Sequence, residues 1–276
     1  MKENQKNEEY LINKKNINQL YCYFKLLFAI IIYIISNHLI GKGIKKKEVN
    51  FLEELMNFNS YSQYYEDLIL FCIFYDIENG FYIDIGANDP NIISVTKGFY
   101  LRGWNGINIE PLPNKYNLLL NERKRDINLQ IGVGKEKGNF SLFLRGPGST
   151  LSNIYKKEKL KILNITVDTM SNVCKKHIPK RKIIQFCKID VEGGERDVLL
   201  GYDFKVYRPK VFCIESTKPA TNIPNHEEWE SILLKNDYSF AYQHRINRFY
   251  VDNRIEGLRE KFKKVDKILN LYKLIK

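Results

Sequence analysis

The sequence lacks the cysteine and histidine patterns of a protein held together by metal or disulfides. Its 276 residues include five cysteines and four histidines, with no CxxC pair and no two histidines at metal-ligand spacing. This odd, scattered set argues against a disulfide framework and a structural zinc site. Cys187 and Cys213 lie inside apolar runs, where cysteine serves as a small buried hydrophobic residue.

Two nucleotide-binding motifs are also missing. There is no G-x-G-x-x-G fingerprint and no G-x-x-x-x-G-K-[ST] loop. The sequence therefore predicts neither a pyrophosphate cradle nor a nucleoside triphosphate loop. A nicotinamide-dependent oxidoreductase, which would use the first motif, is disfavoured for the same reason.

The positive charge is concentrated at the two ends of the chain. The net charge is +12, of which residues 1–50 and 254–276 contribute +5 each, leaving +2 on residues 51–253. A nucleic-acid groove neutralises several phosphates at once. The near-neutral body therefore predicts no nucleic-acid partner, and we expect one folded domain at 51–253 between two basic extensions.

No uninterrupted apolar run reaches the roughly 20 residues that a membrane span needs. The longest, Leu26 to Ile35, has ten residues and is long enough only when counted within residues 20–40, with Lys25 reaching toward the headgroups. We predict an uncleaved membrane anchor there, and hence a membrane-associated, otherwise cytoplasmic protein. A core or interfacial helix and a signal peptide are the alternatives, although no A-x-A cleavage site follows. Lysines flank both sides, so the orientation stays open.

The C-terminal extension, residues 254–276, has apolar residues at spacings of three and four. They are Ile255, Leu258, Phe262, Val265, Leu269 and Tyr272. This spacing predicts a basic amphipathic C-terminal helix. Such a helix either lies on an anionic membrane surface or packs against its own domain.

Short apolar runs alternate with helix-length segments in the body of the chain. The predicted strands are 81–85, 106–109, 127–133, 184–189 and 210–214, and the predicted helices are 92–102, 113–124, 169–177, 194–201 and 226–236. Runs at 139–144 and 163–167 form an insertion, and runs at 239–242 and 248–251 are joined tightly enough to require an antiparallel hairpin. The predicted fold class is a doubly wound α/β domain with a mostly parallel seven-stranded sheet and a C-terminal antiparallel hairpin.

Small residues and an acid follow the first two predicted strands. In a doubly wound sheet, ligands bind beyond the carboxyl ends of the strands, and the first turn must let the backbone approach the ligand. Gly86 and Ala87 satisfy that requirement. Glu110 closes the second strand 24 residues after Gly86, and a carboxylate there can accept both hydrogen bonds of a ribose diol. Turn and acid together predict a nucleoside cofactor, and Asp84 could meet the ammonium group of a methionine moiety.

Further acids follow the fourth and fifth predicted strands. The fourth continues into Asp190-Val191-Glu192-Gly193-Gly194-Glu195. Capping of a helix N-terminus explains Glu195 and in part Glu192. It does not explain Asp190, because an acid that closes a buried strand is costly unless something there needs it. Glu215 ends the fifth strand in the same way.

Together these segments resemble the FkbM family of O-methyltransferases over about residues 60–252. The segments that carry the resemblance are Ser62-Gln63-x-x-Glu66-Asp67, Tyr82–Asn88, Ser94–Tyr100, Arg102–Pro111, Ser149-Thr150-Leu151, Lys188–Glu195 and Asn247–Val251. The resemblance implies the class I methyltransferase fold. One departure is Asn88-Asp89-Pro90, where the family commonly carries an acid and a glycine.

The resemblance implies S-adenosylmethionine as cofactor and a small-molecule or glycan hydroxyl as acceptor. The residues that it assigns to the cofactor are Asp84, Gly86, Ala87, Asn88, Ser94 and Glu110, with Gly132 and Val133 beside the adenine and Asp190 near the methyl group. The candidate bases are Asp190, Glu192, Glu215 and His244, and we favour the first two for their place at the strand ends. A divalent cation on these carboxylates is conceivable, although the spacing demands no metal.

Two other functions remain open from the sequence. The first is a membrane-tethered binding protein that kept the fold and lost catalysis, against which the retained Asp84, Glu110 and Asp190 argue. The second is a nucleic-acid methyltransferase. The near-neutral body and the absence of an Asn/Asp-Pro-Pro-aromatic motif count against it.

Overall fold

A computed structural model describes residues 27, 30–31, 46–144, 161–179 and 181–276. Residues 60–263 form one compact unit, which overlaps the predicted domain over residues 60–253, and the described residues 46–59 and 264–276 belong to a second. Most of the predicted anchor at residues 20–40 and the motif Ser149-Thr150-Leu151 lie outside the described residues. In the part of the chain that is described, no helix has the length and apolar character required to cross a bilayer.

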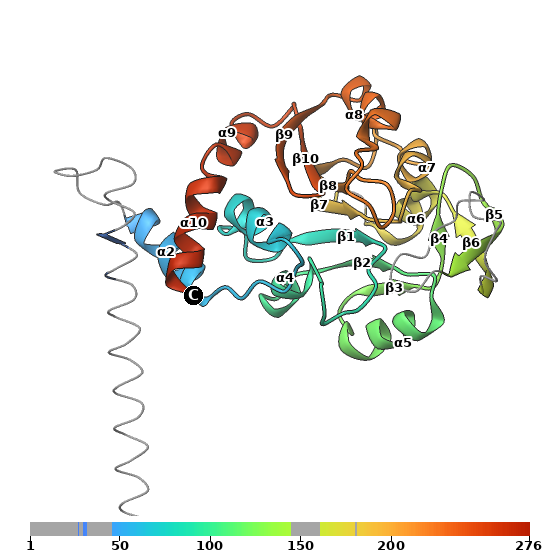
Figure 1. The fold of residues 1–276 in the computed structure, drawn as a ribbon, viewed down its shortest axis with the longest axis horizontal. Helices are drawn as coiled ribbons and strands as arrows, with labels where there is room; N and C mark the ends of the chain where they lie inside the picture. The colour runs from blue at the N-terminus through green and yellow to red at the C-terminus, as the bar shows by residue number, and fades with distance from the viewer. Residues whose placement is uncertain (1–26, 28–29, 32–45, 145–160, 180) are drawn as a thin grey trace, which may run out of the picture. The chain divides into compact units, whose positions relative to one another are not determined.

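A seven-stranded sheet forms the centre of the larger unit (Figure 1). In spatial order its strands are β3 (Ile127–Leu129), β2 (Asn105–Ile109), β1 (Phe81–Ile85), β7 (Ile184–Ile189), β8 (Pro209–Glu215), β10 (Asn247–Asp252) and β9 (Tyr238–His244). The first five are parallel to one another, whereas β10 runs antiparallel to both β8 and β9. The predicted doubly wound sheet with its C-terminal antiparallel hairpin is therefore confirmed.

A second, three-stranded sheet carries the insertion. Its order is β4 (Gly132–Val133), β6 (Lys161–Asp168) and β5 (Gly138–Leu144), with β5 and β6 antiparallel. The predicted strand 127–133 is divided between the two sheets. The main-sheet part ends at Leu129 because its partner β2 ends at Ile109, and the chain then pairs with β6 instead.

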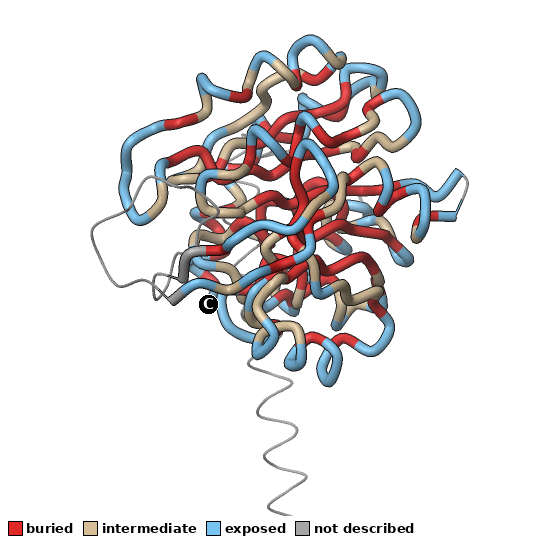
Figure 2. Tube along the Cα trace, turned by 90° about the vertical axis from the view of Figure 1, so that its right-hand side faces the viewer, coloured by how far each residue is buried: buried red, intermediate tan, exposed pale blue. Residues whose placement is uncertain are grey.

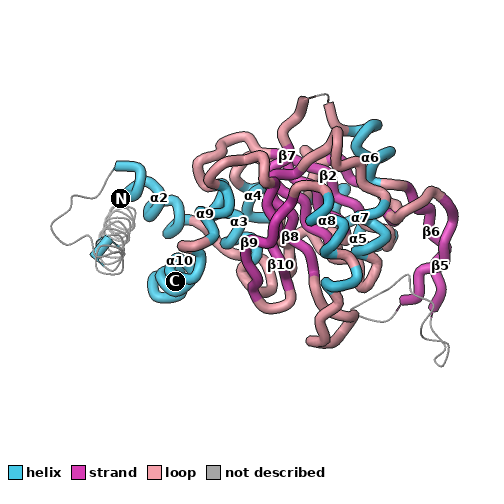
Figure 3. Tube along the Cα trace, turned by 90° about the horizontal axis from the view of Figure 1, so that it is seen from above, coloured by secondary structure: helices cyan, strands magenta, loops and turns pink. Residues whose placement is uncertain are grey.

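Helices cover both faces of the main sheet, as the view from above shows (Figure 3). In the larger unit they are α3 (Glu66–Phe74), α4 (Lys97–Leu101), α5 (Pro113–Glu122), α6 (Met170–His177), α7 (Glu195–Leu200), the 3-10 helix η1 (His226–Glu228), α8 (Glu230–Lys235) and α9 (Leu258–Phe262). Residues of α6, α7 and α8 share one buried apolar cluster with Ile83 and Cys187. The opposite face of β1 and β7 carries Tyr82 and Phe186, whose rings stack at a centroid distance of 5.8 Å.

The burial pattern agrees with this layered arrangement (Figure 2). Every residue of β1 and β7 is buried, whereas exposed residues lie in the surrounding helices and connections. Neighbouring positions of a strand point to opposite faces. Since Tyr82 pairs with Phe186 and Asp84 with Lys188 in the register of β1 and β7, Asp84 and Lys188 lie side by side on one face near the strand ends.

Three predicted helices differ from the observed ones. The helix predicted at 226–236 is divided into η1 and α8. The helix predicted at 92–102 begins only at Lys97, because Asn88 (φ 50°) and Ile93 (φ 55°) adopt left-handed backbone conformations that no right-handed helix contains. The predicted C-terminal helix is two helices, α9 and α10 (Val265–Ile275). Their apolar faces have different partners, since α9 contacts β9 and β10 whereas α10 contacts α2 (Lys46–Asn57).

Candidate active site at the strand ends

A cavity of about 450 Å³ lies at the carboxyl ends of the parallel strands. The predicted site residues that line it are Gly86, Ala87, Asn88, Glu110, Gly132, Val133, Asp190 and Glu192. Four others, Asp84, Ser94, Glu215 and His244, are not among its lining residues. The structure thus brings eight of the predicted residues to the wall of one cavity and leaves the other four outside it.

Gly86 allows two backbone turns to meet at the edge of this cavity. It has φ +75°, a conformation that side chains strongly disfavour, and a Cβ atom at this position would lie 1.8 Å from the backbone oxygen of Asp190. Its amide and that of Ala87 donate to the carbonyl of Ile109, at 3.0 and 3.1 Å. The sequence predicted that this turn lets the backbone approach a ligand. In the structure the turn already lies against the backbone of Ile109 and Asp190.

Glu110 is buried at the end of β2, yet it lines the cavity. Its two carboxylate oxygens accept hydrogen bonds from the amides of Asn88 and Leu112, each at 2.8 Å. Burial raises the pKa of Glu110 above its ordinary value, although these two bonds act in the opposite direction. A carboxylate oxygen can accept two hydrogen bonds, so Glu110 keeps acceptor capacity for a ligand.

Lys188, rather than Asp84, reaches the cavity. Asp84 is 2% exposed, accepts a hydrogen bond from Thr96 at 2.9 Å and lies 3.4 Å from the Lys188 Nζ. The same Nζ donates to the carbonyl of Gly86 at 2.8 Å and lies 3.4 Å from Oδ2 of Asp190. Burial by itself would lower the pKa of Lys188, but the carboxylates of Asp190 and Asp84 raise it above its ordinary value. Lys188 is therefore a cation held between two acids.

Ser94 and His244 lie away from the cavity wall. The Ser94 hydroxyl accepts a hydrogen bond from Arg123 at 3.0 Å, and the same guanidinium donates to the carbonyl of Pro90 at 2.6 Å. These contacts hold the loop that follows the first turn. His244 pairs with Asn247 across the β9–β10 hairpin, and its ring stacks on Tyr242 at a centroid distance of 6.2 Å.

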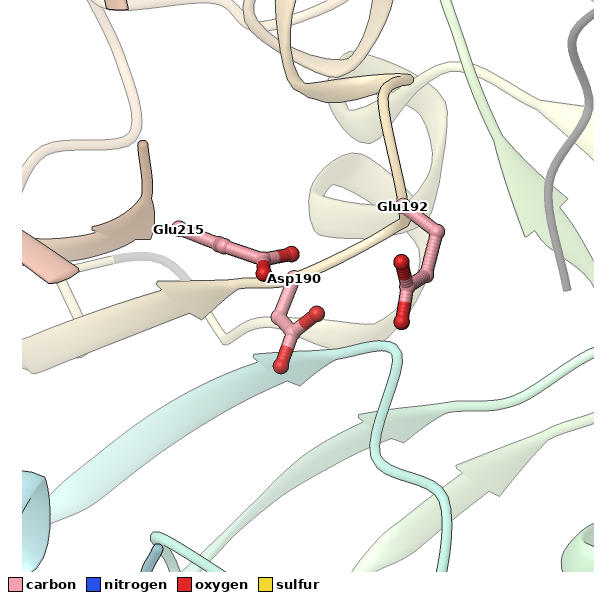
Figure 4. Close-up of side chains that lie close together, drawn as sticks. All are labelled: Asp190, Glu192 and Glu215. Atoms are coloured by element: carbon pink, nitrogen blue, oxygen red, sulfur yellow. The ribbon is translucent and has the colours of Figure 1, made fainter. Parts of the chain in front are cut away.

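Three carboxylates gather where β7 and β8 end (Figure 4). One oxygen from each of Asp190, Glu192 and Glu215 lies within 4.8 Å of the other two. The sheet register explains this, because Ile189 pairs with Ile214 and the next residues are Asp190 and Glu215. Burial, followed by repulsion from Asp190, raises the pKa of Glu192 to about 7 and that of Glu215 well above its ordinary range.

Glu195, which follows these acids, lies at the start of α7 as predicted, but its hydrogen bonds go to the turn before the helix and it makes no capping bond. Its Oε1 accepts hydrogen bonds from the amides of Val191 and Gly193, at 3.2 and 3.1 Å. Glu192 has no such role, and its φ of 54° turns the backbone just after the strand. Glu195 therefore holds the turn, whereas Asp190 and Glu192 line the cavity.

The sheet is that of the class I methyltransferase fold, and its carboxyl edge carries acids at or next to the ends of β1, β2, β7 and β8. Residues 84–240 match the family model of the methyltransferase FkbM domain. The chain belongs to this family of methyltransferases.

Among solved structures, the METTL16 MTase domain (crystal form 2) is similar, with 13% sequence identity and a TM-score of 0.35. The similarity covers 68% of this chain and 65% of that one, so this chain spans less than two thirds of that structure's length. A comparison with curated proteins gave no match.

Proposed function

We propose that this methyltransferase uses S-adenosylmethionine and transfers the methyl group to a hydroxyl oxygen of a sugar, glycan or small-molecule acceptor. The observation that carries the proposal is a single cavity that joins Glu110 to Asp190 and Glu192. Glu110 suits a nucleoside sugar, and the other two acids suit a reaction that releases a proton.

The residues of the cavity fit the cofactor. A volume of about 450 Å³ lies within the range of about 300–1,000 Å³ typical of small-molecule sites. Glu110 has acceptor capacity for a ribose diol, and Gly132 and Val133 line the cavity where the purine would lie. Lys188 offers a cation to the carboxylate of the methionine moiety, which differs from the predicted contact between Asp84 and the ammonium group.

The cofactor, when bound, supplies a methyl group on a positively charged sulfur. The chain must then hold the acceptor oxygen in line with that group and remove its proton. A base works best when its pKa lies near the working pH, and the pKa of Glu192 is about 7. Asp190, whose side chain is 39% exposed, is open to an entering acceptor.

Calorimetry on the full chain tests the cofactor. We expect S-adenosylhomocysteine to bind at one site per chain, and NAD and ATP to give no heat of binding. A folded protein that takes up none of the demethylated cofactor would contradict the assignment. The full chain is used because both ends of the chain contribute to the smaller compact unit, so a truncated chain would remove part of it.

A methyl-transfer assay against a panel of glycans and hydroxylated small molecules tests the acceptor. We expect transfer to at least one hydroxyl, blocked by Asp190→Ala. Transfer only to amines or nucleic acid would overturn the oxygen acceptor. Binding of the cofactor without transfer to any acceptor class would instead favour the inactive binding protein.

A further inference from the structure

We propose that Asp190, Glu192 and Glu215 form a binding site for one divalent cation beside the methyl-transfer cavity. The site goes beyond the proposed function, because a cation can bind there whether or not the chain transfers methyl groups. Its three ligands come from the ends of two adjacent parallel strands, β7 and β8, and from the turn after β7.

The first observation is the geometry of the oxygens. One carboxylate oxygen from each residue lies within 4.8 Å of the others, and Figure 4 shows the three carboxylates converging. Two ligands on opposite sides of a cation are twice the metal–oxygen distance apart, or about 4–5 Å for Mg²⁺ to Ca²⁺. The three oxygens can therefore surround a single ion with little movement.

The second observation is independent of the clustering. Glu215 is 7% exposed, and among the described residues no group donates a hydrogen bond to its Oε2. Thr217 reaches only Oε1, at the long distance of 3.5 Å. Oε2 of Glu192 is likewise buried without a donor in the described part of the chain. Such oxygens are rare in proteins because leaving a buried acceptor unpaired is costly, and a cation would satisfy both.

The local charge points in the same direction. Asp84, Asp190, Glu192 and Glu215 are four acids, and within the described residues Lys188 is the only lysine or arginine in ion-pair distance of any of them. Lys188 lies near Oδ2 of Asp190, and the carboxyl group of Glu215 lies within hydrogen-bonding reach of the same side chain. Lys188 thus pairs with the cluster from one side only, and a cation on the other side would take the place of protons held by Glu192 and Glu215.

The ligand set selects the kind of cation. Only carboxylate oxygens converge here, and the described cysteines at 72, 174, 187 and 213 are all buried and outside the group. Hard oxygen ligands favour Mg²⁺, Mn²⁺ and Ca²⁺ over zinc or copper. Three protein ligands leave coordination positions for water and for an acceptor hydroxyl. The cation would therefore lie on the acceptor side of the cavity and help to orient that oxygen.

Metal titration of the full-length protein tests this site. The protein is first treated with EDTA and dialysed, and free Mn²⁺ is then measured by electron paramagnetic resonance. We expect one saturable Mn²⁺ site that Mg²⁺ or Ca²⁺ displaces. Glu215→Gln and Asp190→Asn should each weaken it at least tenfold, whereas Glu227→Gln, which alters an exposed acid outside the cluster, should leave it unchanged.

Two results would overturn the site. One is the absence of saturable binding by wild-type protein that still binds S-adenosylhomocysteine, which would mean that the acids share protons instead. The other is equal Mn²⁺ affinity in wild type and both cluster variants. Circular dichroism and S-adenosylhomocysteine binding by the variants separate loss of the metal site from loss of the fold, and failure of the metal site leaves the cofactor proposal untouched.

Discussion

Acids at two places along the main sheet of this methyltransferase differ in their hydrogen bonding. Asp126 lies next to β3, where its Oδ1 accepts from the amide of Gly106 at 2.8 Å. Its Oδ2 accepts from the Tyr82 hydroxyl at 2.6 Å and the Asn108 amide at 2.9 Å. At the ends of β7 and β8, by contrast, Glu192 and Glu215 each bury an oxygen that receives no hydrogen bond from the described residues.

The difference separates a structural acid from a functional one. A buried carboxylate with three donors stabilises the strands that supply them, because the donors would be unpaired without it. Buried carboxylates that repel one another destabilise the fold and persist where a ligand or a reaction uses them. Asp126 should therefore matter for stability, and the acids at the strand ends for activity.

The largest expected effect is on methyl transfer. Asp190→Asn removes a candidate base and the partner of Lys188, and we expect kcat/KM to fall by about 100-fold or more. The free energy of unfolding should change by less than about 1 kcal/mol, because Asp190 is partly exposed. Initial rates and urea unfolding of the same preparation check both expectations. Full activity of Asp190→Asn would contradict the assignment of the acids at the strand ends to activity.

The opposite pattern is expected at the structural acid. Asp126→Ala leaves the donors of Tyr82, Asn108 and Gly106 unpaired, and we expect a loss of about 3 kcal/mol of stability. Glu215→Gln, measured in EDTA, should instead change stability by less than about 1 kcal/mol, because the amide replaces a carboxyl group whose charged form is disfavoured by burial and by Asp190. Urea unfolding curves provide both values. If Glu215→Gln proved the more destabilising change, the distinction between the two groups would be wrong.

Much of this architecture could be predicted from alternating apolar runs. The boundaries of β1 and β7 agree with the predicted strands 81–85 and 184–189, because short runs bounded by turn residues are a strong local signal. The convergence of acids from different strands also followed from the rule that parallel strands end at one edge of a sheet.

Other features depend on contacts that no local pattern reveals. Leu142 and Ile165 line the cavity from β5 and β6, but their sequence resembles that of any half-buried hairpin. The division of 127–133 between two sheets depends on where β2 ends. Lys188 did carry a signal, since a lysine inside an apolar strand needs an acidic partner. That Lys188 and not Asp84 lines the cavity could be seen only from the positions of the side chains.

Glu110 is intermediate between the two groups, and its expected effect is smaller. Its oxygens are paired with backbone amides, like those of Asp126, yet it lines the cavity. We expect Glu110→Gln to weaken S-adenosylhomocysteine binding about tenfold, the cost of a hydrogen bond to a charged group. Glu122→Gln, an exposed change on the adjacent helix α5, should bind like wild type in calorimetry. Equal affinity in both variants would place Glu110 with the purely structural acids.

The pH dependence of S-adenosylhomocysteine binding tests whether Glu110 contacts the ligand, and it is the smallest effect that we expect. Burial raises the pKa of Glu110, and only its ionised form accepts hydrogen bonds with both oxygens. Affinity should therefore be constant above this raised pKa and fall as the pH drops through it, by at most about tenfold per pH unit for one proton.

Glu110→Gln, which has no proton to gain, should show a flat profile over that interval. S-adenosylhomocysteine is the appropriate ligand because its sulfur carries no positive charge, so the acids at the strand ends influence its affinity less than that of S-adenosylmethionine. A variant whose affinity falls with pH as steeply as that of wild type would assign the titration to another group.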